Sequence, residues 1–176
     1  MSATPKMSIY ESTFAQSDKT DAILVVEGKK LHVNKSLLSC HSTYFKTMFN
    51  SAPGSSEFQI DNVSLEEFAT LLSQFQLNPI KPTRRNVENV LKLADRFALP
   101  AAKRYVELYL MTSYEFNFGF DETIRIAKEH ELYCLLERTI CWEPPKFIEF
   151  IYSGHFKTLP DKVQAKILHS CLDRYK

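Results

Sequence analysis

The stretch that decides the fold is Asp21-Ala-Ile-Leu-Val-Val-Glu-Gly-Lys-Lys-Leu-His-Val-Asn34. It opens with a β-branched apolar run over residues 22–26, which is typical of a strand covered on both faces. Residues 31–34 then alternate apolar and polar side chains, the pattern of a strand with one face in water. Because Gly28 lies between the two runs, the stretch predicts a β-hairpin closed by a glycine-containing turn.

The segment that follows, residues 35–49, predicts two helices with a common apolar face. Its apolar side chains recur in adjacent pairs about every seven residues, as one helix face requires. Ser42 and Thr43 lie in the middle, where a hydroxyl side chain can end one helix and cap the next. We therefore expect a helical hairpin whose apolar residues are Leu37, Leu38, Tyr44, Phe45, Met48 and Phe49.

The rest of the chain predicts one short strand at residues 58–60 and then helices alone. Ser64-Leu-Glu-Glu67 fits the capping box that begins a helix, and Asn86 is a candidate cap for the next helix. Pro100 suits the first position of a further helix. Later helices are expected from a cap at Asp121, over 132–140, over 147–152 and after Pro160. Strands gathered near the amino end and followed by helices indicate an α+β fold.

The composition is that of an ordinary globular protein with little net charge. Apolar residues make up 44% and charged residues 24%, and the formal net charge is +1. Such a charge gives no field that recruits nucleic acid or an anionic membrane. No run approaches the roughly 18 apolar residues that cross a bilayer, and no signal-peptide core is present. We expect no nucleic-acid or membrane partner, and a cytoplasmic or nuclear location.

Sequence motifs for catalysis are missing. With 4 Gly in the chain, neither phosphate-loop pattern can be written, and no GxSxG nucleophile elbow occurs. His130 has no second His one helical turn away, so a solvated helix face is favoured over a metal or acid–base site. The basic cluster at 81–85 reads as a solvated loop, with an anionic contact as the alternative. We predict no catalytic residue, cofactor, metal or small-molecule substrate.

The cysteines are predicted to be reduced thiols that pack as small apolar groups. Cys40, Cys134, Cys141 and Cys171 are too far apart in sequence for a CxxC pair or a zinc ligand set. Cys40 falls on the apolar stripe and is expected to be buried. It adjoins His41, but neighbouring residues on a helix point in different directions and do not readily share a hydrogen bond.

These residues resemble the opening of a BTB/POZ domain. That family shows an Asp before an apolar strand, a Gly turn, and then Lys-x-Leu-Leu, Ser-x-Tyr-Phe and Met-Phe. The likeness continues through residues 63–68 and 90–99, and residues 150–161 are similar to the region after the BTB domain in nematode BTB and MATH-BTB proteins. The matching motif positions are Asp21, Gly28, Lys35, Leu37, Leu38, Ser42, Tyr44, Phe45, Met48 and Phe49.

The resemblance implies three parts along the chain. Residues 1–17 are polar apart from the isolated apolar residues Ile9, Tyr10 and Phe14, so we expect a flexible arm that is disordered or becomes ordered only on a partner. The BTB/POZ domain, a small β-sheet flanked by a helical cluster, is expected over 18–112. An all-helical extension that resembles a BACK domain is expected over 113–176.

The resemblance further implies a non-enzymatic dimerisation module, commonly an adaptor for a cullin-3 ubiquitin ligase. Expected partners are a second copy of the chain, cullin-3 and sibling BTB proteins. The family's dimer seam uses the arm, the first strand and the first helix after the hairpin. The candidate seam residues are therefore Asp21 and Leu37, followed by Ile9, Tyr10 and Phe14. The alternative for Leu37 is the core of its own chain, since a helix stripe serves the core first.

The candidate cullin-facing loop comprises Phe49, Pro53 and Ser55. Cullin-binding members often carry a hydrophobic-x-Glu motif at this place, whereas this chain has Pro53-Gly54-Ser55. The alternative function is therefore an assembly module of the structural or transcription-corepressor type, without cullin binding. Trp142 is a candidate partner anchor, with packing between helices as its alternative role.

The 176 residues leave no room for a MATH, kelch or zinc-finger domain. We therefore expect one of three arrangements: clients dock on the BTB and helical surfaces, the chain is a fragment, or the chain pairs with fuller proteins.

Overall fold

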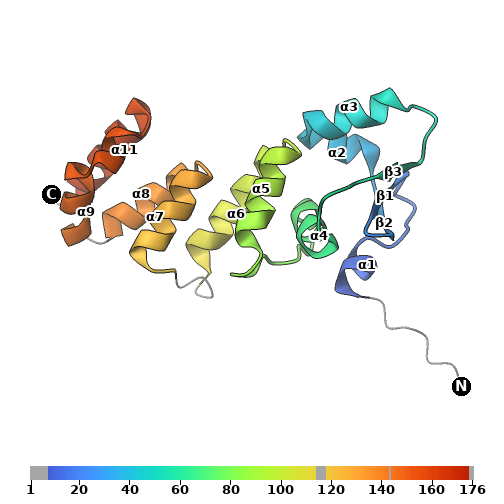
Figure 1. Ribbon diagram of the computed structural model, residues 1–176, viewed down its shortest axis with the longest axis horizontal. Helices are drawn as coiled ribbons and strands as arrows, with labels where there is room; N and C mark the ends of the chain where they lie inside the picture. Colours follow the sequence, from blue (N-terminus) through green and yellow to red (C-terminus); the bar gives the residue numbers. More distant parts are fainter. Residues whose placement is uncertain (1–7, 114–117, 143, 175–176) are drawn as a thin grey trace, which may run out of the picture. The chain divides into compact units, whose positions relative to one another are not determined.

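The computed structural model describes residues 8–113, 118–142 and 144–174, without the side chains of residues 142, 144–147 and 174. The chain divides into two compact units, Met1–Val106 and Glu107–Lys176. The first contains a sheet and helices, and the described part of the second is helical (Figure 1). The fold class is α+β, as the order of the sequence patterns predicts.

A three-stranded sheet organises the first unit. Strands β1, Ala22–Val26, and β2, Lys29–Val33, pair antiparallel, and β3, Glu57–Gln59, pairs parallel with β1. The order β2-β1-β3 places β1 in the centre, in agreement with its continuous apolar run. Glu27 and Gly28 have φ values of 49° and 74°, the left-handed backbone of a two-residue hairpin turn. The predicted hairpin is confirmed.

The predicted helical hairpin is also present, as α2, Lys35–His41, and α3, Thr43–Ser51. Ser42 separates the two helices. Its Oγ accepts a hydrogen bond from the Phe45 N–H at 3.1 Å and donates one to the Phe97 carbonyl at 2.6 Å. The break in the helix is therefore tied to a residue 55 positions later in the chain.

Three further helices complete this part of the structure: α4, Leu65–Ser73, α5, Val87–Arg96, and α6, Pro100–Thr112. Pro100 is the first residue of α6, as expected. The core contains an aromatic cluster in which the rings of Phe45 and Phe97 stack with centroids 5.6 Å apart. Phe68 meets Phe97 edge-on at 5.0 Å. Leu24, Leu31, Leu71, Leu91 and Leu99 are fully buried in the same unit.

Ser64 and Asn86 are the N-cap residues of α4 and α5, as predicted, but neither side chain makes a capping hydrogen bond. Ser64 makes no side-chain capping bond; instead the Leu65 N–H donates to Oε2 of Glu27, in the hairpin turn, at 3.0 Å. The Asn86 side chain makes no capping bond at α5, because its Oδ1 accepts from the Thr83 N–H at 2.7 Å. At α5 the cap oxygen thus has another donor, and at α4 a carboxylate from the hairpin turn accepts one of the first N–H groups of the helix.

The described part of the N-terminal arm, residues 8–17, differs from the flexible segment expected. It contains helix α1, Ile9–Thr13, which begins with a capping box between Ser8 and Glu11 that the sequence reading missed. Glu11 also pairs with Lys29 of β2 at 2.9 Å. The Phe14 carbonyl accepts from the His32 N–H at 2.9 Å, so the arm is hydrogen-bonded to the sheet.

The second unit consists of α7, Phe120–Glu129, α8, Tyr133–Trp142, α9, Pro144–Tyr152, α10, Gly154–Lys157, and α11, Asp161–Arg174. Gly119 is the N-cap of α7, which places Asp121 in the first turn and corrects its predicted role as the cap. The buried Glu107 carboxylate accepts the N–H groups of Cys134 and Leu135 at 2.8 and 3.0 Å, and so caps α8. Within the described ranges, no helix has both the length and the apolar character that a membrane span requires.

Candidate functional site

The paired apolar residues of α2 and α3 divide into an inner and an outer stripe. The second member of each pair, Leu38, Phe45 or Phe49, is buried in the protomer. The first members form the outer stripe, which we define as Leu37, Tyr44 and Met48. Leu37 and Tyr44 keep 40% and 41% of their surface exposed, and Met48 is half-buried. The sequence showed six apolar positions, and the structure assigns three of them to the core.

Leu37 borders a hollow of about 350 Å³ beside the end of α1. Phe14, Leu38 and Phe75 supply apolar wall, and His32 is among the other lining residues. The His41 ring stacks on Phe75 with centroids 4.6 Å apart, which holds one wall in place. The hollow therefore combines a partly exposed leucine with a firm apolar wall.

The other candidate seam residues have different surroundings. Ile9 is exposed and Tyr10 is half-buried, and burial together with the Glu66 charge raises the pKa of Tyr10. Asp21 is exposed, and its Oδ1 accepts from the Lys35 N–H at 2.7 Å at the start of α2. Phe14 is only 3% exposed, so its side chain belongs to the core of the protomer. This corrects its predicted place in a seam.

A second hollow, of about 520 Å³, lies beside the outer stripe and was not foreseen from the sequence. Tyr44 and Met48 line it from α3, and Arg96 lines it from the end of α5. The Arg96 guanidinium donates to the carbonyls of Asp61 and Asn62 at 2.9 and 2.8 Å, which fixes its position. A usable signal was the Tyr44–Met48 spacing of one helical turn, which places both side chains on one helix face. The remaining lining residues are Thr43, Thr47 and Ala98.

The candidate cullin-facing loop presents less surface than expected. Phe49 is buried and packs edge-on against Phe58 at 5.0 Å, which corrects its assignment to an outward surface. Lys35 Nζ donates to the Ser55 carbonyl at 2.7 Å, so the half-buried Ser55 is tied to α2. Pro53 is exposed.

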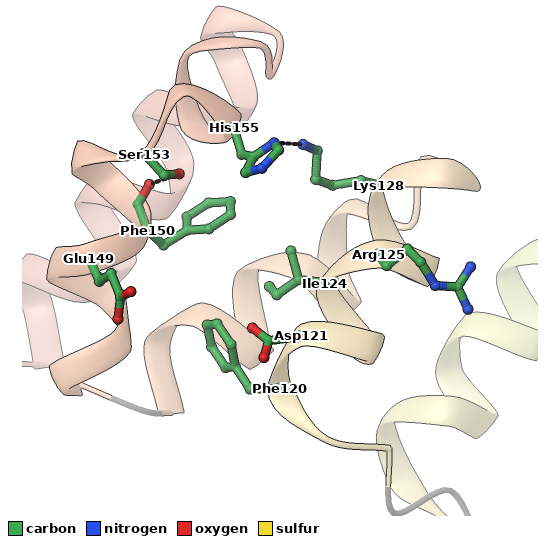
Figure 2. A pocket seen from close by; sticks show the side chains of 9 residues that line it. All are labelled: Phe120, Asp121, Ile124, Arg125, Lys128, Glu149, Phe150, Ser153 and His155. Atoms are coloured by element: carbon green, nitrogen blue, oxygen red, sulfur yellow. Dashed lines mark hydrogen bonds between the residues drawn. The ribbon is translucent and has the colours of Figure 1, made fainter.

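The helical unit contains a hollow of about 580 Å³ between α7 and the α9–α10 segment (Figure 2). Phe150 points toward Ile124 across the hollow, and Phe120 lies at the start of α7 (Figure 2). Asp121 and Glu149 contribute carboxylates to the lining. The hollow therefore has an apolar floor and acidic groups along its edge.

The basic lining groups of this hollow already have partners. Lys128 Nζ lies 3.2 Å from Nδ1 of His155 (Figure 2). Arg125 pairs with Glu129 at 3.0 Å. Trp142 is the last residue of α8, but its side chain lies outside the described residues, so its role as an anchor stays a prediction.

Two residues weighed for chemistry have surroundings opposite to those expected. His130 was predicted on a solvated face but is buried directly after α7. Its backbone N–H donates to the Ile126 carbonyl at 3.0 Å. Cys40, predicted in the core, is exposed, because α2 turns Leu38 inward instead.

The comparison with family models decides the identity. The model of the BTB/POZ domain matches residues 10–114, more than half of the chain. The chain belongs to the BTB/POZ family. The BTB/POZ match includes the sheet, the outer stripe, helices α2 to α6 and all of α1 except Ile9. The more exact limits expected from the sequence, 18–112 and 113–176, stay a prediction.

Similar curated BTB proteins come from nematodes. A BTB/POZ domain-containing protein of Caenorhabditis elegans is 37% identical over 132 residues, which are 72% of this chain and 41% of that protein. BTB and MATH domain-containing protein 36 of the same organism is 38% identical over 95 residues, 52% of this chain and 30% of that protein. The chain thus spans less than half the length of these relatives.

Among solved structures, the BTB domain of human gigaxonin aligns with a TM-score of 0.47 at 20% identity, covering 62% of this chain and 99% of that one.

Proposed function

We propose that this BTB protein is a non-enzymatic, dimerising adaptor of the cytoplasm or nucleus. In this proposal it joins cullin-3 or a sibling BTB protein to a client, and the client binds the helical unit. One observation carries the proposal: the outer stripe leaves large apolar side chains exposed on a protomer whose inner stripe already fills the core. An apolar surface of this kind is typical of a protein–protein contact.

The Leu37 region is the part that we assign to a second copy of the chain. A two-fold interface buries one patch against the same patch of its partner, so Leu37 is covered on both copies at once. Ile9 is exposed on α1, and the hollow beside Leu37 extends to the end of that helix. Asp21 begins the segment that leads into the central strand. These residues support a seam formed by the arm, the hairpin and α2.

A charge at position 37 tests this seam. Leu37→Asp places a carboxylate in the proposed interface, and we expect the dimer to dissociate to a folded monomer or to aggregate. Leu77→Asp is the matched control, because Leu77 is 94% exposed and does not line the hollow. Light scattering after size exclusion gives the mass, and circular dichroism checks folding. A Leu37→Asp protein that keeps the mass of a dimer would remove the seam assignment.

The second hollow, which Tyr44, Met48 and Arg96 line, is the surface that we assign to cullin-3. A partner side chain entering it meets the Tyr44 ring and the Met48 thioether, while carbonyl hydrogen bonds hold Arg96 at the edge. Aromatic residues in such positions often contribute strongly to binding. The hydrophobic-x-Glu motif is missing from Pro53-Gly54-Ser55, so the affinity must come from the hollow itself.

Titration of the full chain with purified cullin-3 tests this assignment by calorimetry. We expect Thr47→Arg, which fills the hollow from an exposed position, to weaken binding at least about tenfold. Lys46→Ala, on an exposed residue of the same helix that does not line the hollow, is expected to bind normally. If the wild-type chain shows no binding at micromolar concentrations, the alternative of an assembly module without cullin binding is favoured.

The α7–α9 hollow is the surface that we assign to a client peptide. Its floor of Phe120, Ile124 and Phe150 suits an aliphatic or aromatic side chain. The carboxylates of Asp121 and Glu149 favour a basic residue next to that side chain.

An array of labelled peptides that pair an arginine with a nearby leucine or phenylalanine tests the client surface. Binding is expected to disappear in the double variant Asp121→Lys/Glu149→Lys and to persist in Asp161→Lys, an exposed position outside the hollow. Equal binding by both variants would refute the assignment.

A further inference from the structure

Two thiols that are distant in sequence meet inside the helical unit. Cys141 lies near the end of α8 and Cys171 lies in α11, and their side chains are 6% and 1% exposed. Their Sγ atoms are 2.6 Å apart. Unbonded heavy atoms pack at about 3.5–4.0 Å, and the sulfur atoms of a disulfide lie about 2.05 Å apart. The fold therefore brings the two sulfur atoms close to bonding distance.

Neighbouring contacts fix the relative position of the two helices without any help from the thiols. Glu137, one turn before Cys141 on α8, accepts from Ser170 Oγ at 2.5 Å and pairs with Lys166 Nζ at 2.7 Å. Both partners belong to α11. Because this network sets the register of α8 against α11, a bond between the sulfur atoms requires little rearrangement of either helix.

We propose that Cys141 and Cys171 form a reversible disulfide that joins α8 to α11 under oxidising conditions. The oxidant is a small-molecule disulfide such as oxidised glutathione. One cysteine thiolate attacks it, forms a mixed disulfide and releases one small thiol. The second cysteine thiolate then attacks the protein sulfur of that mixed disulfide and releases the other small thiol. Two protein thiols are oxidised, one small disulfide is reduced, and the two protons end on the released thiols.

The burial of the pair controls the rate of this reaction. An oxidant reaches the sulfur atoms only when α11 separates briefly from α8. Leu168 and Leu172 of α11 are exposed, so part of the apolar surface of this helix does not help to hold it in place. Cys40 is exposed and Cys134 is half-buried, so these two thiols react with alkylating reagents first.

The disulfide would selectively stabilise the helical unit. It links positions 30 residues apart, and closing such a loop reduces the freedom of the unfolded chain. In the oxidised chain the disulfide keeps α11 attached to α8, whereas in the reduced chain α11 can separate briefly from α8. The pair thus couples the stability of the helical unit to the thiol–disulfide balance of its surroundings.

The test uses the full chain with Cys40→Ser and Cys134→Ser, which leaves only the buried pair. The protein is equilibrated in glutathione buffers of increasing oxidation, acid-quenched, denatured and titrated for free thiols. We expect two thiols per chain in reduced buffer and none in oxidised buffer, with an intact-mass loss of two hydrogens. The Tm is expected to rise by on the order of 5 °C or more on oxidation and to return with dithiothreitol.

Further substitution of Cys171→Ala or Cys141→Ser provides two controls, each of which must abolish the Tm rise. Persistent glutathione adducts, cross-linked dimers or two titratable thiols in the most oxidising buffer would each overturn the proposal. A rise in Tm that survives either control substitution would also overturn it.

Discussion

Replacement of Ser42 by alanine tests the link between the helical hairpin and the core. The hydroxyl caps α3 by accepting the Phe45 N–H, and it donates to the Phe97 carbonyl. Ser42 is 2% exposed and Phe97 is fully buried, so water does not readily replace the lost bonds. Loss of an N-cap costs about 1 kcal/mol. A buried carbonyl that loses its donor costs about 1–3 kcal/mol.

The sum is a destabilisation of about 2–4 kcal/mol, a large share of the ~5–15 kcal/mol that stabilises a typical domain. Urea unfolding followed by far-ultraviolet circular dichroism measures it. With an m-value of about 2 kcal/mol/M, the midpoint is expected to fall by roughly 1–2 M. Thr47→Ala is the control: its Oγ1 donates to the Thr43 carbonyl on the exposed side of the same helix. A Ser42→Ala midpoint equal to that of Thr47→Ala would refute the role assigned to Ser42.

Two other substitutions test the hairpin turn and the α8–α11 network. Gly28→Ala is expected to cost about 1 kcal/mol in urea unfolding, because Gly28 has a φ of 74°, whereas Gly54→Ala meets open space at an ordinary φ and is expected to be nearly neutral. Burial raises the pKa of Glu137, but the hydrogen bonds from Lys166 and Ser170 outweigh it and leave this pKa below the ordinary value. That contribution to stability is present above pH ~4.3 and is lost as the pH falls through the lowered pKa. The Tm of the wild-type chain is therefore expected to fall with pH over that range, and Glu137→Gln is expected to make this fall smaller. An equal fall of Tm in the two proteins would contradict this.

Short-range patterns predicted much of the first unit. The alternation at residues 31–34 and the Gly28 turn specify the hairpin, and Ser42 is placed where a hydroxyl can divide a helix. These features depend on neighbours within a few residues, which the sequence shows directly. The BTB/POZ family resemblance rested on the same residues and is confirmed.

Features that depend on distant partners were missed. The Ser64 side chain makes no capping bond, and the Leu65 N–H donates instead to Glu27, which lies 38 residues away and reaches α4 only after the hairpin forms. Phe14 is buried because the arm packs onto β2, which no local pattern reveals. Adjacent apolar residues such as Tyr44 and Phe45 looked equivalent in sequence, and only packing shows which one faces outward.

Sedimentation equilibrium of the unmodified chain tests the dimer most directly. The protomer has a mass of 20.4 kDa, so a pair weighs twice 20.4 kDa, or 40.8 kDa. We expect the higher mass at micromolar concentrations, and the protomer mass once Leu37 is replaced by aspartate. A wild-type protein that remains at 20.4 kDa at every concentration tested would contradict the claim that the Leu37 region joins two copies of the chain.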